Sequence, residues 1–232
     1  MSTIAENIAK IRDEINRAAI AAGRNPKDIL LCAATKMNDA ESVRKAIAAG
    51  VDCCGENRVQ ELVQKQAANA YDGAPVHFIG HLQTNKVRQV VGKVALIQSV
   101  DSLRLLDAIQ AEALRQGIIQ NILLEVNIGH EETKSGFHPS QIHAICENMS
   151  TYPNIRMLGL MAIPPICQFS GENRKFFQEM CKLSVDITAK KYDNIRVRIL
   201  SMGMSNDFRD AIACGSTMIR IGTGIFGPRN YH

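Results

Sequence analysis

The sequence lacks the long apolar runs and the charge excess that mark two large classes of protein. No stretch reaches the roughly 18 uninterrupted apolar residues of a membrane-spanning helix. The net charge is only +4 across 232 residues, and the basic and acidic side chains are interspersed, which argues against a nucleic-acid partner. The N-terminal segment carries acidic residues and no apolar core, unlike a secretory signal peptide. We therefore expect a cytoplasmic protein without membrane or nucleic-acid partners.

Cysteine pairs with the spacing of redox or zinc motifs are also missing. The chain has seven cysteines, an odd number, and none of them forms a CxxC pair. We interpret them as reduced thiols, most of them small core residues. Cys53 and Cys54 are expected to close the second strand, with one of them facing the interior. His77 and His81 are four residues apart on a strand that runs into a loop rather than on a helix, so we expect no metal site.

The chain does contain apolar stripes with the spacing of helices. The first predicts an N-terminal helix that Gly23 can close, and its apolar face consists of Ile4, Ile8, Ile11 and Ile15. Asn38 is positioned to cap a second helix. Two further stripes have the apolar faces Leu103, Leu106, Ile109 and Phe176, Met180, Leu183, Ile187.

Eight apolar runs rich in β-branched residues alternate with helical segments. They are Ile29–Thr35, Val51–Gly55, Val76–Gly80, Val94–Val100, Ile122–Ile128, Ile155–Ile163, Val197–Met202 and Met218–Ile221. Such alternation predicts a parallel sheet with right-handed crossovers, covered on both faces. Eight units close into a barrel, so we predict an α/β protein, a (β/α)8 TIM barrel with an extra N-terminal helix. No linker divides residues 1–232, which indicates one domain and makes an open doubly wound sheet the weaker alternative.

The first apolar run leads directly to a lysine. The chemistry of TIM barrels lies at the carboxyl ends of the strands, and Lys36 would be the last residue of the first strand, at the barrel mouth. The apolar strand behind it would desolvate the ammonium and lower its pKa, and a neutral amine is a nucleophile toward carbonyl carbon. The alternative is that Lys36 is simply the first solvated residue of a loop.

Two glycine-rich loops follow the last two predicted strands. They read SMGMSNDF from Ser201 and GTGIFG from Gly222. Loops at these positions of a barrel often bind phosphate through backbone N–H groups, and Ser201 and Thr223 add hydroxyl donors. Together with Lys36 they predict a ligand that has a carbonyl at one end and a phosphate at the other. Pyridoxal 5′-phosphate (PLP), held as a Schiff base, and a phosphosugar in a lysine-dependent aldolase both fit.

Arg220 bears on the choice between these ligands. It lies in the last strand, two residues before Gly222, and either points into the barrel or forms a salt bridge outside it. An arginine keeps its proton, so beside the pyridine nitrogen of PLP it could only donate, and that nitrogen would stay unprotonated. This would weaken the cofactor as an electron sink.

Several motifs together resemble the pyridoxal phosphate homeostasis proteins, which are single-domain relatives of the alanine racemase N-terminal barrel. The motifs are ATK, GENRVQEL, HFIGHLQTNK, KSGF, GLMAIPP, LSMGMSNDF and GSTMIRIGTGIFGPRNY. The resemblance extends from about Ile29 to Tyr231, and it implies a TIM barrel with PLP on Lys36. The other PLP-binding residues that it implies are Asn57 beside the ring, His81 at the rim, Arg220 at the pyridine nitrogen, and Ser201, Met202, Gly222 and Thr223 at the phosphate.

The resemblance also implies a function in vitamin B6 and amino-acid balance rather than in a metabolic reaction. A racemase on this fold needs an acid–base group on each face of the cofactor. Lys36 can serve one face, none of the four tyrosines is an evident second base, and the chain has no room after Pro228 for the domain that supplies one in alanine racemases. We therefore expect a monomeric carrier or buffer of PLP that can supply apo enzymes, with a PLP-dependent racemase as the alternative. Lys134 is either an ordinary loop lysine or a second site of PLP attachment.

Overall fold

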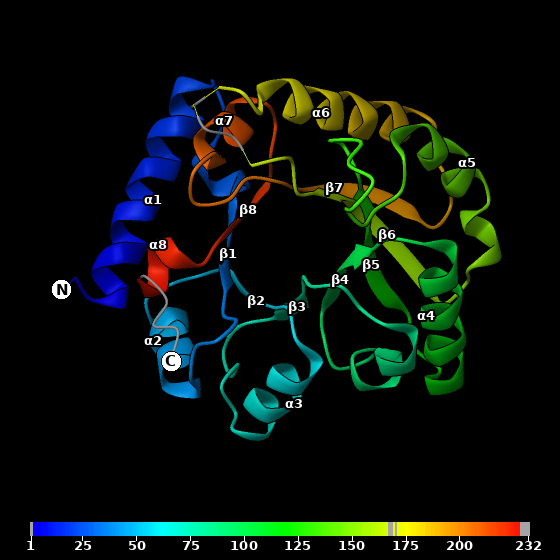
Figure 1. The fold of residues 1–232 in the computed structure, drawn as a ribbon, viewed down its shortest axis with the longest axis horizontal. Helices are drawn as coiled ribbons and strands as arrows, with labels where there is room; N and C mark the ends of the chain where they lie inside the picture. The colour runs from blue at the N-terminus through cyan, green and yellow to red at the C-terminus, as the bar shows by residue number, and fades with distance from the viewer. Residues whose placement is uncertain (1, 167–168, 170, 228–232) are drawn as a thin grey trace.

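The structure is a computed structural model that describes residues 2–166, 169 and 171–227. Its eight parallel strands follow one another around a closed barrel, in which β8 returns to pair with β1 (Figure 1). The predicted TIM barrel is confirmed, and each of the eight predicted runs overlaps a strand. The strands are β1 Leu30–Ala34, β2 Cys53–Glu56, β3 Val76–Phe78, β4 Leu96–Val100, β5 Gln120–Val126, β6 Ile155–Ala162, β7 Ile195–Ser201 and β8 Met218–Ile221.

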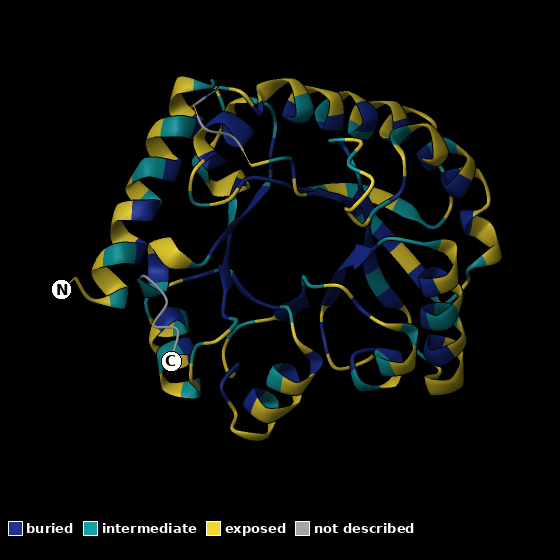
Figure 2. Ribbon diagram, in the orientation of Figure 1, coloured by how far each residue is buried: buried dark blue, intermediate teal, exposed yellow. Residues whose placement is uncertain are grey.

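Helices surround the strands and cover their outer faces (Figure 1). The α-helices are α1 Ile4–Ala21, α2 Ala40–Ala48, α3 Val59–Ala67, α4 Leu103–Gln116, α5 Ile142–Glu147, α6 Arg174–Ala189, α7 Phe208–Ala213 and α8 Thr223–Phe226. Short 3₁₀ turns occur as well, and the one at Thr84–Gln89 lies between β3 and β4. Buried residues gather on the strands and on the inner faces of the helices, whereas exposed residues lie on the outer faces (Figure 2). None of the helices in the described part of the chain is long and apolar enough to cross a membrane.

Helix α1 is the predicted extra N-terminal helix. Thr3 caps it, because its hydroxyl accepts a hydrogen bond from the Glu6 backbone N–H while the Glu6 carboxylate accepts one from the Thr3 N–H. Its buried face carries Ile8, Ile11, Ile15 and Ala19. This face packs against the last helices, α7 and α8, so the start of the chain supports the loops that follow β7 and β8 (Figure 1).

Three details of the predicted strands and caps are wrong. The cap of α2 is Asp39, which accepts from the Ser42 N–H at 2.7 Å, whereas the Asn38 amide donates to the Lys36 carbonyl at 3.0 Å. Strand β1 ends at Ala34, so Lys36 lies two residues beyond it. Cys53 begins β2 instead of closing it. In each case the predicted helix or strand is present, and only the position of its cap or its end differs, by one or two residues.

The predicted apolar faces of α4 and α6 are confirmed except at the first residue of each. Leu103 is 52% exposed, and the buried face of α4 begins at Leu105. In α6 the first buried aromatic residue is Phe177, while Phe176 lies at the edge of the core. Adjacent apolar residues compete for the inner face of a helix, and packing against the barrel decides between them.

Candidate functional site

A cavity of about 600 Å³ opens at the carboxyl ends of the strands. Its lining comes from loops that follow β1, β2, β3, β5, β6, β7 and β8, as expected for the functional end of a TIM barrel. The structure brings six of the eight predicted site residues together in this lining: Lys36, Asn57, His81, Arg220, Gly222 and Thr223. Lys134 also borders the cavity, on the exposed loop after β5. The cavity therefore contains two amines.

Lys36 is half-buried, and its backbone is held from both sides. The carbonyl of Thr35, just before it, accepts a hydrogen bond from the Lys65 ammonium at 2.7 Å. The Lys36 carbonyl itself accepts from the Asn38 amide. These contacts fix the direction in which the chain leaves β1, and so they fix the position from which the lysine side chain enters the cavity.

A buried ion pair lies beside the end of β1. Lys65 on α3 approaches the Glu56 carboxylate to 2.6 Å, and the side chains are 8% and 0% exposed. The same carboxylate accepts hydrogen bonds from the hydroxyls of Thr35 and Tyr71, at 3.1 and 3.2 Å. Burial and the neighbouring Glu56 raise the pKa of Tyr71. This network was not predicted, although a glutamate inside the buried strand β2 was a signal that a buried partner must exist.

Arg220 points into the barrel, where it is 5% exposed. Its guanidinium donates to the Ser201 hydroxyl at 2.6 Å and to the Ala162 carbonyl at 3.0 Å. Burial lowers the pKa of Arg220 from its usual value, and the nearby Glu125 opposes that shift. The outer-face salt bridge that the sequence left open is therefore not formed. The Ser201 hydroxyl and the Ala162 carbonyl thus hold the guanidinium within the barrel, and Arg220 also borders the cavity.

Ser201 and Met202 do not border the cavity. The Ser201 hydroxyl is fully buried, where it accepts from Arg220 and donates to the Gln98 side-chain oxygen at 2.7 Å. Met202 packs in the core, and its N–H donates to the Met218 carbonyl at 3.1 Å. Both residues lie too early in the β7 segment to reach the mouth.

Ser205, which was not among the predicted site residues, is the serine of the SMGMSNDF motif that borders the cavity. It lies in the loop after β7, and its hydroxyl is 3.4 Å from that of Thr223, in the loop after β8. Both residues border the cavity together with Gly222. The motif SMGMSNDF contains both Ser201 and Ser205. Because β7 ends at Ser201, the second serine, Ser205, lies in the loop beyond the strand and reaches the cavity.

Asn57 supplies a polar atom without a partner. Its backbone N–H donates to the Glu56 carboxylate at 2.9 Å, but its buried side-chain oxygen has no hydrogen-bond partner in the described part of the chain. The backbone of Asn57 passes close to Gly80. Glycine is required there, since a Cβ on Gly80 would lie 2.2 Å from the Asn57 carbonyl oxygen. Buried acceptors are normally satisfied. An unsatisfied one in the cavity lining fits a site that a polar ligand completes.

His81 and Asp101 form a polar pair at the rim of the cavity. The His81 Nδ1 lies 2.9 Å from an Asp101 carboxylate oxygen, and the histidine side chain is 61% exposed. His81 therefore lies where the sequence expected it. His77, four residues earlier, faces the barrel interior, so the two histidines do not meet.

Glu125, at the end of β5, is a cavity residue that was not anticipated. Burial raises its pKa to about 7, and the neighbouring Asp101 carboxylate adds to that shift, while Arg220 and His81 oppose it. Among the tyrosines, Tyr71, Tyr152 and Tyr192 do not border the cavity, and Tyr231 lies outside the described residues. Glu125 is a titratable group in the cavity lining, and its signal in the sequence is the single acidic residue in the apolar run NILLEV.

We expect the free energy of unfolding to fall as pH rises through the range in which Glu125 ionises. The folded-state pKa of about 7 lies above the usual 4.5, so between these values the folded chain binds more protons than the unfolded chain and loses stability as they leave. Glu125→Gln removes this dependence. Urea titrations at pH 5 and pH 8 should show that the wild type loses about 2–3 kcal/mol more than the variant. Equal losses would place the ionisation of Glu125 outside this range.

Comparison with known proteins gives the chain relatives over its whole length. The family model of the alanine racemase N-terminal domain matches residues 2–230. A pyridoxal phosphate homeostasis protein of Aquifex aeolicus is 41% identical over 226 residues, which are 97% of this chain and 98% of that protein. A crystal structure of an unknown protein from Bifidobacterium adolescentis has a TM-score of 0.91 and 37% identity, covering 96% of this chain and 94% of that one.

A third relative carries a ligand. The structure of PipY of Synechococcus elongatus with PLP bound has a TM-score of 0.83 and 31% identity, and the match covers 97% of this chain and all of that one. The shared barrel and the family model define an alanine racemase N-terminal domain. Within that class, the chain belongs to the family of pyridoxal phosphate homeostasis proteins.

Proposed function

We propose that this chain binds PLP through a Schiff base to Lys36 and serves PLP homeostasis as a carrier or buffer. The observation that carries the proposal is one cavity that is lined both by the amine of Lys36 and by the neighbouring hydroxyls of Ser205 and Thr223. The printed names of the relatives, and the PLP bound to PipY, support the same ligand. The unsatisfied oxygen of Asn57 adds a polar contact that a ring substituent can complete.

Each residue of the site has a distinct task in this proposal. Lys36 would hold the cofactor through its amine, since an amine is a nucleophile toward an aldehyde carbon. Arg220, held by Ser201 and Ala162, would face the pyridine nitrogen as a hydrogen-bond donor that keeps its own proton. PLP itself supplies an electron sink, which an unprotonated ring nitrogen weakens. The arrangement favours retention of the cofactor over carbanion chemistry.

The phosphate end is assigned to the two loops after β7 and β8. Ser205 and Thr223 offer hydroxyl donors, and the first backbone N–H groups of α8 have no carbonyl partner within their own helix. Ser205→Ala should weaken PLP binding about tenfold, the loss expected for one hydrogen bond to a charged group. Ser135→Ala is the matched control, because this serine lines the same cavity in the loop after β5. Fluorescence or absorbance titration with PLP measures both, and an equal affinity for the two variants would remove Ser205 from the site.

The experiment that tests the function begins with the wild-type chain loaded with PLP. Borohydride reduction should convert one equivalent of bound PLP into a stable adduct, and peptide mapping should place it on Lys36. An adduct mainly on Lys134 would move the attachment to the loop after β5. A chain that gains no PLP and no visible absorbance would contradict the proposal and favour the phosphosugar-binding alternative.

A racemase or related PLP-dependent enzyme is the second candidate, and Glu125 favours it. With a pKa raised to about 7, this carboxyl can exchange a proton near neutral pH, and it shares the cavity with Lys36. Incubation of the loaded protein with L-alanine in heavy water separates the two functions. A carrier should leave the α-proton in place, whereas an enzyme should exchange it, and Glu125→Gln should slow that exchange.

We further propose that the chain is a cytoplasmic monomer and that it passes PLP to apo enzymes. Light scattering after size exclusion tests the monomer. Activation of an apo enzyme by the loaded protein, compared with the same concentration of free PLP, tests delivery. Activation no faster than the rate at which PLP leaves the protein spontaneously would indicate a buffer.

A further inference from the structure

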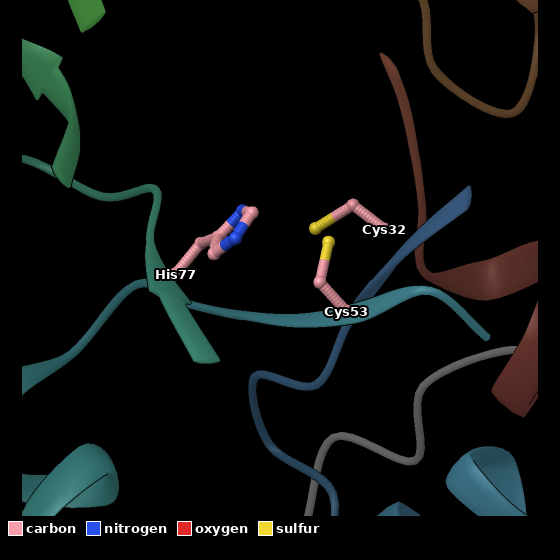
Figure 3. A group of neighbouring side chains, drawn as sticks. All are labelled: Cys32, Cys53 and His77. Carbon is pink, nitrogen blue, oxygen red and sulfur yellow. The ribbon is translucent and has the colours of Figure 1, made fainter. Parts of the chain in front are cut away.

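Two thiols and an imidazole meet inside the barrel, below the site described above. Cys32, Cys53 and His77 come from the consecutive strands β1, β2 and β3, and their side chains point toward one another (Figure 3). Cys32 and Cys53 face each other in the register of the β1–β2 pair. The two sulfur atoms and a ring nitrogen of His77 all lie within 4.8 Å of one another. All three side chains are buried, with exposures of 0%, 2% and 7%.

We propose that Cys32, Cys53 and His77 bind a thiophilic divalent cation, with Zn²⁺ as the physiological ion. Two cysteines and one histidine are a common zinc ligand set. Zn–S bonds of about 2.3 Å and a Zn–N bond of about 2.0 Å place tetrahedral ligand atoms about 3.6–3.8 Å apart. The observed limit of 4.8 Å requires each pair to close by at most about 1 Å. Among the residues that the structure describes, this is the one cluster of three such ligand atoms.

The charge of the cluster suits a divalent ion in a buried place. Both thiols release a proton when they bind, so one Zn²⁺ replaces two protons and the ligand set stays neutral. This matters because an uncompensated charge in the interior is costly. The thioether of Met218 packs against the same two cysteines, which extends the soft, polarizable surroundings of the sulfurs.

A chain of hydrogen bonds orients the imidazole. Arg220 can only donate, so the Ser201 hydroxyl must pass its own proton toward the Gln98 oxygen, and the Gln98 amide then donates to the His77 Nδ1 at 2.9 Å. Metal-binding histidines are typically oriented at the ring nitrogen that does not bind the metal, where the ring N–H donates to an acceptor. With Nδ1 facing Gln98, Nε2 is the nitrogen that takes the metal.

Metal binding must therefore change the hydrogen bond to Gln98. Without metal, Nδ1 accepts from the amide, and the proton of the neutral ring is on Nε2. Coordination through Nε2 moves that proton to Nδ1, so Gln98 must turn its side-chain oxygen toward the ring. The change reaches Ser201 and, through its hydroxyl, Arg220, which borders the cavity. Occupancy of the metal site is thereby linked to the position of Arg220.

The proposed metal site and the proposed PLP site have no binding residue in common. None of Cys32, Cys53 and His77 borders the cavity that contains Lys36. The six described cysteines are free thiols, and the seventh, Cys167, lies outside the described residues. The spacing of the three ligands along the chain matches no zinc motif, because each is contributed by a different strand and only the barrel brings them together. The expectation of no metal rested on spacing alone.

Zinc content is the first test. The full-length chain is expressed in zinc-supplemented medium, purified under reducing conditions, dialysed and analysed for metal, with and without bound PLP. We expect about one Zn²⁺ per chain, falling below about a tenth of that in Cys32→Ala and Cys53→Ala. Cys146→Ala is the matched control, because it removes another buried thiol far from the cluster and should keep the metal. Zinc that persists in the Cys32→Ala, Cys53→Ala double variant would overturn the proposal, as would a wild type without zinc.

A second test needs no substitution. Nitrogen NMR of the ¹⁵N-histidine-labelled chain should show His77 with its proton on Nε2 in the metal-free form and on Nδ1 after Zn²⁺ is added. In parallel, Zn²⁺ should protect Cys32 and Cys53 from alkylation, while the reactivity of the half-buried Cys181 stays unchanged. An unchanged tautomer together with unprotected thiols would contradict the site. These readouts do not involve PLP, so failure of one proposal is distinguishable from failure of the other.

Discussion

Lys36→Ala is expected to abolish covalent PLP binding and to lower the apparent affinity on the order of 100-fold or more, because the Schiff base is lost and only the non-covalent contacts of the cavity remain. Lys36 is the amine that follows β1, and its backbone is fixed by Lys65 and Asn38. The variant should have no Schiff-base absorbance and no adduct after borohydride reduction. Its fold should be unaffected, because the side chain is half-buried at the mouth rather than packed in the core.

Lys134→Ala is the matched control for this loss. It removes the other cavity amine, which lies on the exposed loop after β5. We expect it to keep the absorbance, the stoichiometry and the adduct on Lys36. Absorbance spectra, borohydride trapping and equilibrium dialysis on the two variants measure these properties. Reducible PLP at the wild-type level in Lys36→Ala would show that another amine carries the ligand.

The fold was predictable because its signals are local and repeated. Eight apolar runs separated by helical stripes admit few topologies, and β8 returns to β1 as a closed barrel requires. Errors were confined to ends and faces, such as Asp39 in place of Asn38 as the cap of α2. Two neighbouring polar residues can both act as a cap, and the choice depends on where the chain leaves β1.

The candidate site was predictable where a residue follows directly from a strand end. Lys36, Asn57 and Thr223 border one cavity because parallel strands in a barrel end at the same face. Ser201 and Ser205 could not be separated in this way, since the sequence does not show where β7 stops. Contacts between buried side chains of different elements, away from the strand ends, were not predicted. Neither the partner of Glu56 nor the meeting of Cys32 with His77 has a signature within one segment of the chain.

The buried pair between Lys65 and Glu56 gives the largest expected effect on stability. Lys65→Met keeps the length and the apolar stem of the side chain but removes the ammonium, so the Glu56 carboxylate loses its opposite charge in a place with 0% exposure. Breaking one member of such a pair costs about 3–5 kcal/mol. The Thr35 and Tyr71 hydroxyls and the Asn57 N–H still donate to the carboxylate, which argues for the lower part of that range. Urea denaturation at pH 7 measures the loss.

Two further variants separate the cost of an unpaired charge from the loss of packing. In Lys65→Met combined with Glu56→Gln the fully buried charge is gone, and Glu61, which also loses Lys65, is partly exposed and keeps Arg58 at 3.7 Å, so the double variant should recover part of the stability lost by Lys65→Met. Lys45→Met breaks the exposed pair of Lys45 with Glu41 and should change the denaturation midpoint little, since both side chains are more than 60% exposed. The Lys65 ammonium also holds the Thr35 carbonyl, so Lys65→Met should weaken PLP binding as well. A loss below about 1 kcal/mol would contradict the stabilising role assigned to the buried pair.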